Sequence, residues 1–259
     1  MTILETNALS KQFGGLTAVS NLDFKVEEGE LLGLIGPNGA GKSTCFNLLS
    51  GAIRPTSGRI FLQDEDITGL KPHLIVARGL TRTFQETRLF MNLSVRENLK
   101  TAFHVSIKGK ILGDIFGSRS QNEIKKRVEQ KTEELISLAG LTDLTTEAAK
   151  NLPHGHQRIL GVTMALATRP KLLCLDEPVT GMNQTEVEFM IKFIQRIRKM
   201  GITIILVEHA MKVVMGICDR VVVINFGEKI AEGTTEEIRK NQKVIEAYLG
   251  GGHNASRSE

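Results

Sequence analysis

One glycine-rich segment has the composition and spacing of a phosphate-binding loop. Residues 36–43 read Gly-Pro-Asn-Gly-Ala-Gly-Lys-Ser and match the pattern G-x-x-x-x-G-K-[ST]. In such a loop the glycines let backbone N–H groups curl around phosphate oxygens, Lys42 reaches the β- and γ-phosphates, and Ser43 offers a hydroxyl to Mg²⁺. The loop must lie between a strand and a helix, which Leu31–Ile35 and Lys42–Leu49 are expected to form. This context favours a nucleoside triphosphate site over a chance match. The residues expected around the phosphates are Gly36, Pro37, Asn38, Gly39, Ala40, Gly41, Lys42, Ser43 and Thr44.

Two carboxylates follow an aliphatic run later in the chain. Asp176 and Glu177 come directly after Leu172–Leu175, a predicted buried strand. Ligands of parallel sheets gather at the carboxyl ends of the strands. Asp176 is suited to hold Mg²⁺, directly or through water, and Glu177 is suited to polarise an attacking water as general base. Taken alone the pair could be an exposed turn. Beside a phosphate loop it favours hydrolysis of the nucleotide over sensing or a structural module without turnover.

Composition and charge narrow the class of protein. The chain has 259 residues, 41% of them hydrophobic, with 33 Lys plus Arg against 29 Asp plus Glu. This is typical of one large globular domain or of a domain with a subdomain. The most basic stretch, residues 119–131, is interleaved with Glu123 and Glu129, so we interpret it as a solvated helix face and expect no nucleic-acid partner.

The sequence also bears on location. No apolar run approaches the roughly 18 residues of a membrane-spanning helix, and the first residues do not resemble a signal peptide. The cysteines, Cys45, Cys174 and Cys218, are far apart and lack metal-ligand spacing. We therefore expect a chain in a reducing, cytoplasmic location, which would need another protein to cross a membrane.

The hydrophobic pattern predicts an α/β fold with two additions. Short antiparallel strands are expected in the first 35 residues and over Arg59–Ile67. Continuous aliphatic runs separated by helical segments, such as Thr185–Met200, predict buried parallel strands. The predicted strands are Leu172–Leu175, Ile202–Val207 and Val221–Ile224. We expect one domain over residues 1–249, with a helical subdomain over about 86–168, and a flexible tail over 250–259.

A further motif connects these features to a known family. The segment Leu152-Pro-His-Gly-His-Gln-Arg158 lies just before the acidic pair. With the phosphate loop and Asp176-Glu177 it resembles the ATP-binding cassette of ABC proteins, over nearly the whole chain. The resemblance implies a P-loop ABC ATPase with a mixed core sheet, an antiparallel β subdomain and a helical subdomain, using ATP and Mg²⁺. It also implies a head-to-tail pair of cassettes, in which Gly155 and the following helix face the ATP of the partner.

Further site residues are carried over from the resemblance. Phe13 lies where an aromatic ring stacks on adenine, and His209 resembles the switch histidine that contacts the γ-phosphate. Gln85 resembles the glutamine that senses Mg²⁺ and water and borders the transmembrane contact. Residues Val179–Asn183 resemble the loop that contacts the other cassette. Taken alone, Phe13 could equally be a core aromatic, Gln85 a surface residue and His209 a structural histidine.

The chain departs from the family pattern at two places. Pro153, His154 and His156 replace the Ser, first Gly and Gln of the commoner signature L-S-G-G-Q. Because proline has no hydroxyl or N–H to offer a phosphate, we predict that the partner cassette is a different polypeptide. With no cysteine or third histidine nearby, His154 and His156 are not favoured as a metal site. Ala210 replaces an acidic residue that is more usual after the switch histidine.

Several stretches resemble the ATP-binding subunits of branched-chain (hydrophobic) amino-acid importers. They are residues 82–90, 93–99, 208–220, 230–233 and 244–249, with an extra segment at about 105–121. This resemblance implies two permease subunits, a second and paralogous ATPase subunit, and an extracytoplasmic solute-binding protein. The chain itself would lie peripherally on the cytoplasmic face of the inner membrane. A urea or amide importer, a lipopolysaccharide-type exporter and a non-transport regulatory ATPase remain alternatives.

Overall fold

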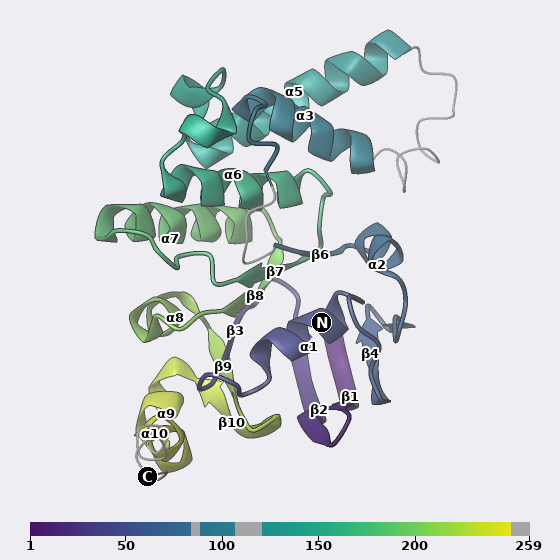
Figure 1. Ribbon diagram of the computed structural model, residues 1–259, viewed down its shortest axis with the longest axis vertical. Helices are drawn as coiled ribbons and strands as arrows, with labels where there is room; N and C mark the ends of the chain where they lie inside the picture. Colours follow the sequence, from purple (N-terminus) through teal and green to yellow (C-terminus); the bar gives the residue numbers. More distant parts are fainter. Residues whose placement is uncertain (84–88, 107–120, 250–259) are drawn as a thin grey trace.

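The computed structural model of this chain describes residues 1–83, 89–106 and 121–249, and it contains two β-sheets (Figure 1). A four-stranded antiparallel sheet has the order β2-β1-β4-β5. Its strands are β1 (Thr2–Phe13), β2 (Leu16–Glu27), β4 (Ser57–Leu62) and β5 (Glu65–Asp66). The predicted antiparallel strands are confirmed, but the expectation that those in the first 35 residues are short is wrong for β1 and β2, which are 12 residues each. Ala8 and Asn21 take positive φ at register shifts between these strands. Bulges at these points let the two strands stay paired where the hydrophobic alternation of the sequence is interrupted.

The second sheet has six strands in the order β10-β9-β3-β8-β7-β6. Its strands are β3 (Leu31–Ile35), β6 (Leu80–Arg82), β7 (Leu172–Asp176), β8 (Thr203–Val207), β9 (Arg220–Asn225) and β10 (Glu228–Thr234). All neighbours are parallel except β9 and β10, which form a hairpin. The predicted mixed core sheet is therefore confirmed, and every residue of β3, β7 and β8 is buried. The sequence pattern did not predict β6 or β10.

Helices flank the six-stranded sheet. They are α1 (Lys42–Leu49), α2 (Pro72–Arg78), α3 (Val95–Ser106), α5 (Gln121–Ala139), α6 (His154–Leu166), α7 (Gln184–Lys199), α8 (Met211–Ile217), α9 (Thr235–Lys240) and α10 (Gln242–Leu249), with 3-10 turns at Thr142–Leu144 and Ala149–Asn151. The predicted helices Lys42–Leu49 and Thr185–Met200 agree with α1 and α7 to within a residue. Figure 1 shows α3, α5 and α6 stacked together beyond the β6 end of the sheet. The expected tail over 250–259 lies outside the described residues, as does most of the extra segment.

Two buried clusters lie on opposite faces of the six-stranded sheet. Successive side chains of a strand point to opposite faces, and β3 accordingly gives Leu31 and Ile35 to one cluster and Leu32 and Leu34 to the other. The first cluster joins the sheet to the helices from α3 onward. The second joins it to α1 and to the antiparallel sheet. The strands that end at the phosphate loop are thus held from both sides.

All three cysteines are buried and unpaired. Cys45 and Cys174 belong to the cluster under the antiparallel sheet, and Cys218 belongs to the cluster under the helices. Burial raises the pKa of Cys45 and of Cys218 to about 12. These thiols therefore stay protonated at neutral pH and are unreactive. Among the helices of the described residues, none combines the length and the apolar character that crossing a bilayer would require.

Candidate active site

The register of the parallel strands brings the predicted motifs to one edge of the sheet. Leu34 of β3 pairs with Val207 of β8, and Val207 pairs with Asp176 of β7. The chain beyond each strand therefore leaves the sheet at the same level. The phosphate loop, Glu177 and His209 follow these three strand ends, as the sequence pattern predicts.

These segments surround one cavity of about 690 Å³, a size typical of small-molecule sites. Its lining residues are Phe13, Leu16, Thr17, Ala18, Asn38, Gly39, Ala40, Gly41, Lys42, Ser43, Thr44, Glu177, His209 and Phe226. The cavity thus brings together most of the predicted phosphate-binding residues, the predicted base and the predicted switch histidine. Phe13 is 48% exposed, so its interpretation as a core aromatic is wrong.

The glycines of the phosphate loop are required by close contacts and backbone conformation. A Cβ atom at Gly36 would overlap the carbonyl oxygen of Ile224 in β9, and one at Gly41 would overlap the carbonyl oxygen of Ala18 in β2. Gly41 also has a φ of 104°, which residues with side chains rarely adopt. The loop is therefore pressed between two strands, which fixes the direction of its N–H groups.

Lys42 is folded back onto its own loop. Its Nζ donates to the carbonyl oxygens of Gly36 at 2.7 Å and Pro37 at 2.9 Å, and the residue is only 5% exposed. Gly36 and Pro37 thus hold the lysine and do not line the cavity. Burial lowers the pKa of Lys42, while the negative charges of Glu177 and Asp176 oppose that shift. The ammonium group lies among the groups expected to surround the phosphates.

Glu177 and His209 are in direct contact. The His209 Nε2 lies 2.8 Å from the Glu177 Oε1. The backbone N–H of Glu177 donates to the Val207 carbonyl at 2.9 Å, which continues the sheet by one residue and fixes the carboxylate at the cavity. The His209 side chain is 44% exposed, which does not fit a histidine kept for core packing. This pair can orient a water molecule at the end of the phosphate chain.

Glu208 is a buried acid that the sequence analysis did not single out. It is 1% exposed, and its carboxylate accepts the backbone N–H groups of Val179 at 2.8 Å and His209 at 3.1 Å. Burial raises the pKa of Glu208, and these backbone donors partly oppose the shift. Glu208 therefore joins the loop after the acidic pair to the backbone of His209. A carboxylate directly after a buried strand is the signal that could have identified it, as it identified Asp176.

Arg82 is a second residue that the sequence analysis did not assign to the site. Its Nη2 lies 2.7 Å from the Asp176 Oδ2, and the two side chains are 9% and 4% exposed. Its Nη1 donates to the Asn47 side chain at 2.6 Å, and its guanidinium lies 5.5 Å from the ring centroid of Phe46. Arginine thus balances the charge of the predicted Mg²⁺ ligand from behind the cavity. Gln85, the other predicted ligand and sensor, lies outside the described residues.

The altered signature begins α6 and contacts the loop after the acidic pair. The Gly155 N–H donates to the Glu186 Oε1 of α7 at 3.2 Å, and a Cβ at Gly155 would lie 2.6 Å from that oxygen. The His154 ring would lie 3.3 Å from a Cβ placed at Gly181. Within this chain the Gly155 N–H therefore has an acceptor of its own. Its contact with the ATP of a partner remains a prediction.

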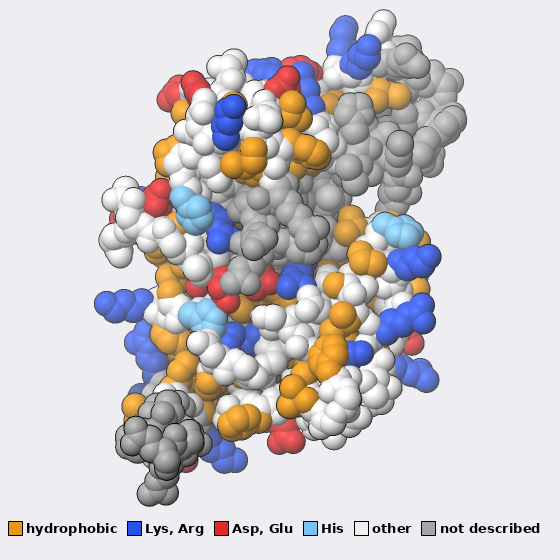
Figure 2. All heavy atoms as spheres, viewed as in Figure 1, with side chains coloured by type: hydrophobic (Ala, Val, Ile, Leu, Met, Phe, Trp, Pro, Cys, Tyr) orange, Lys and Arg blue, Asp and Glu red, His pale blue; other side chains and the backbone are white. Residues whose placement is uncertain are grey.

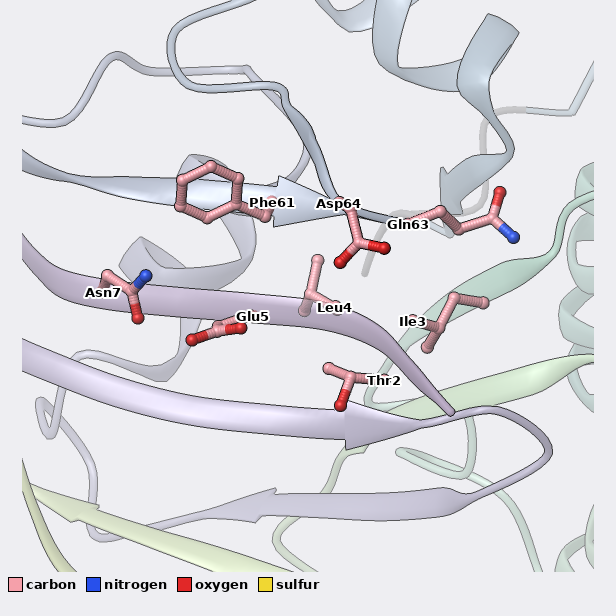
Figure 3. Close-up of a pocket in the computed structure, with 8 residues that line it drawn as sticks. All are labelled: Thr2, Ile3, Leu4, Glu5, Asn7, Phe61, Gln63 and Asp64. Carbon is pink, nitrogen blue, oxygen red and sulfur yellow. The ribbon is translucent and has the colours of Figure 1, made fainter.

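A second hollow of about 270 Å³ lies on the antiparallel sheet (Figure 3). Figure 3 shows its residues along β1, on β4 and at the turn after β4, and they are Thr2, Ile3, Leu4, Glu5, Asn7, Phe61, Gln63 and Asp64. This lining includes two carboxylates and no lysine or arginine. It is therefore unsuited to phosphate, and the cavity at the phosphate loop is the candidate active site.

Comparison with known sequences places the chain among transport ATPases. The family model described as ABC transporter matches residues 19–180, and that described as Branched-chain amino acid ATP-binding cassette transporter matches residues 228–254. The high-affinity branched-chain amino acid transport ATP-binding proteins BraF of Pseudomonas aeruginosa and LivG of Escherichia coli are 41% and 40% identical over 249 residues. Each alignment covers 96% of this chain and 98% of the relative. The lipopolysaccharide export system ATP-binding protein LptB of Haemophilus influenzae is 30% identical with the same coverage.

Solved structures agree with this placement. The ADP conformation of MJ1267, an ATP-binding cassette of an ABC transporter, superposes with a TM-score of 0.83 at 28% identity, covering 96% of this chain and 99% of that one. A nucleotide-free ATP-binding cassette from an ABC transporter gives the same TM-score at 29% identity, with the same coverage. The predicted fold class is thereby confirmed. The chain belongs to the ABC transporter family and is one of its ATP-hydrolysing cassettes.

Proposed function

We propose that this chain hydrolyses ATP to drive the import of branched-chain or related hydrophobic amino acids. The contact between Glu177 and His209, in the cavity that holds Lys42, is the observation that carries the ATPase part. The amino-acid part is supported by the relatives BraF and LivG and by the family match over residues 228–254. That match covers β10, α9 and α10, which are separate from the catalytic motifs.

The phosphates would bind at the loop whose carbonyl groups hold Lys42. The loop N–H groups and the N-terminus of α1 receive the phosphate oxygens. The Lys42 Nζ, bound to the Gly36 and Pro37 carbonyls, exchanges these for oxygens of the β- and γ-phosphates. Because the new partners are charged, the exchange strengthens the contacts of the ammonium group and keeps it protonated.

Hydrolysis then depends on Glu177 and His209. The Glu177 carboxylate polarises a water molecule for attack on the γ-phosphorus and accepts its proton. His209, in contact with the Glu177 Oε1, holds that carboxylate and reaches the γ-phosphate. Glu208 fixes the backbone of His209, so that the imidazole and the carboxylate keep one relative position. Positioning and charge stabilisation account for most catalysis in phosphoryl transfer.

The residues at hand fit a magnesium ion. Ser43 is exposed on the cavity, and Asp176 ends the strand just before Glu177, which lines the same cavity, so a hydroxyl and a carboxylate would supply oxygen ligands that Mg²⁺ prefers. Asp176 itself is paired with Arg82 and does not line the cavity, so it would have to share its carboxylate between Arg82 and the ion. Gln85 is the third proposed ligand, by resemblance. When bound, the ion neutralises negative charge on the phosphates.

The proposed partners follow from the resemblance to the ATP-binding subunits of branched-chain amino-acid importers. They are two permease subunits, a second and paralogous ATPase subunit, and an extracytoplasmic solute-binding protein. The chain would lie peripherally on the cytoplasmic face of the inner membrane. The two cassettes would face head to tail, with the altered signature and Gly155 of this chain at the ATP of the paralogue. ATP drives the permeases because it binds the closed pair of cassettes more tightly than the open pair.

The test measures ATP hydrolysis in membranes that contain the chain with its neighbouring permeases, paralogue and binding protein. Stimulation by leucine-loaded binding protein, lost in Glu177→Gln, is the expected result. Stimulation by urea in place of leucine would support the proposed ATPase activity but would show that the transported solute is urea. Activity that does not depend on any binding protein would favour an exporter or a regulatory ATPase, although the identity to LptB, 30%, is lower than that to BraF, 41%.

A further inference from the structure

A second aromatic residue lines the cavity beside the predicted adenine contact. Phe226 lies in the turn between β9 and β10, is 85% exposed, and shares the cavity lining with Phe13 and Lys42. Figure 2 shows hydrophobic side chains exposed low on this face, where β2 and β10 begin in Figure 1. A ring so exposed contributes little to the core, so packing does not explain its presence.

The backbone at Phe226 disfavours a large side chain. Phe226 and Gly227 have φ angles of 47° and 82° and lie between the paired residues Asn225 and Glu228. Positive φ at both central residues is the requirement of a type I′ hairpin turn, in which Asn, Asp and Gly are preferred. A bulky residue at positive φ is an outlier, and such outliers cluster at functional sites.

The turn is fixed to the phosphate loop. The Gly227 N–H donates to the Ala40 carbonyl at 2.9 Å, and the Gly227 carbonyl accepts the Ser20 N–H of β2 at 2.9 Å. The backbone of Phe226 is therefore held beside the phosphate loop. The same strand β2 leads back to Leu16, which pairs with Phe13 and also lines the cavity. Phe13 thus lies at the turn of the β1–β2 hairpin and Phe226 at the turn of the β9–β10 hairpin, and β2 is hydrogen-bonded to the second turn through Ser20.

We propose that Phe226 is a second contact for the purine base of the bound nucleotide, opposite or beside Phe13. This inference rests on the proposed nucleotide site. The Lys11 Nζ lies 5.0 Å from the Phe13 ring centroid, so one face of that ring contacts a cation, while the residue also lines the cavity. Aromatic rings stack on any base because every base has a π face, and a purine offers the larger one.

The experiment compares ADP with pyrophosphate, which lacks the base and the ribose. Calorimetric titration of the full-length chain gives the Kd of each. The informative variant is Phe226→Asn, because Asn-Gly is the preferred type I′ pair and the turn keeps its conformation without the ring. Phe226→Asn should weaken ADP about tenfold, within the range for loss of one stacking ring, and leave pyrophosphate unchanged. Phe226→Tyr should bind ADP as the parent does, and Phe13→Ala should lose affinity for ADP alone.

The outcomes separate this inference from the proposed function. Unchanged ADP affinity in Phe226→Asn overturns the base contact, and so does an equal loss for ADP and pyrophosphate, which would mean that the turn shapes the phosphate loop. Unchanged ADP affinity with weaker ATP-dependent pairing of the cassettes would assign the ring to the cassette interface instead. Failure of the parent chain to bind ADP at all would refute the nucleotide site itself.

Discussion

Arg82→Ala should destabilise the fold strongly, because it breaks an ion pair that is closed to water. The partners, Arg82 and Asp176, are 9% and 4% exposed and 2.7 Å apart. Removing one partner of a buried pair typically costs about 3–5 kcal/mol, since the other charge is left in a poorly solvated site. The lost contacts with Asn47 and Phe46 add to this. Because a domain is stable by only about 5–15 kcal/mol, the variant should lose a large part of its stability.

The matched control is Arg78→Ala. Arg78 also forms an ion pair, with Glu65 at 2.6 Å, but these side chains are 29% and 55% exposed. Pairs in contact with water contribute only about 0–1 kcal/mol, so this variant should remain close to the parent. Urea unfolding followed by circular dichroism measures both free energies of unfolding. A similar loss in the two variants would refute the reasoning that burial decides the effect, and so would a loss below about 1 kcal/mol in Arg82→Ala.

Three further changes test other parts of the site. Burial raises the pKa of Glu208, so the folded chain binds that proton more tightly than the unfolded chain, and stability should fall as pH rises from the ordinary value of 4.5 through the raised pKa. Glu208→Gln should remove this part of the decline in urea unfolding across pH, and an unchanged slope would contradict the assignment. Gly36→Ala should cost roughly 2 kcal/mol or more in thermal unfolding and abolish ADP binding, because its Cβ would overlap a backbone carbonyl. Gly15→Ala, with open space around the Cβ, should do neither. His209→Ala should lower kcat of the assembled transporter by about a hundredfold and leave the Kd of ADP unchanged, whereas weaker ADP binding at full kcat would show a binding role instead.

The sequence predicts those parts of the site that depend on neighbouring residues. The phosphate loop needs a strand, a tight glycine turn and a helix in succession, and each leaves its own local pattern around residues 36–43. Asp176 and Glu177 are predicted for the same reason, as polar residues that end an aliphatic run. The continuous aliphatic strands predict a sheet covered on both faces, which is what the two clusters provide.

Residues that act across the sheet leave no such local pattern. Arg82 meets Asp176 only because β6 pairs with β7, and Glu208 meets Val179 only because β7 pairs with β8. Phe226 reaches the cavity through the Gly227 contact with the phosphate loop. These pairings join distant parts of the chain, so their partners follow from sheet order and register and not from spacing. The full length of β1 and β2 is not predicted, because the hydrophobic alternation of the sequence is interrupted where bulges nevertheless allow the two strands to stay paired.

The buried cysteines can report local opening of the two hydrophobic clusters through their rates of alkylation. A thiol reagent attacks the thiolate, and burial with a raised pKa withholds that form from Cys45 and Cys218 in the native chain. Each thiol is alkylated only when the cluster that covers it opens, so the labelling rates of Cys45 and Cys174 follow one face of the sheet and that of Cys218 follows the other. Equal rates would mean that both faces melt as one unit. A cysteine introduced on the surface would, for the same reason, carry a fluorophore without competition from the native thiols.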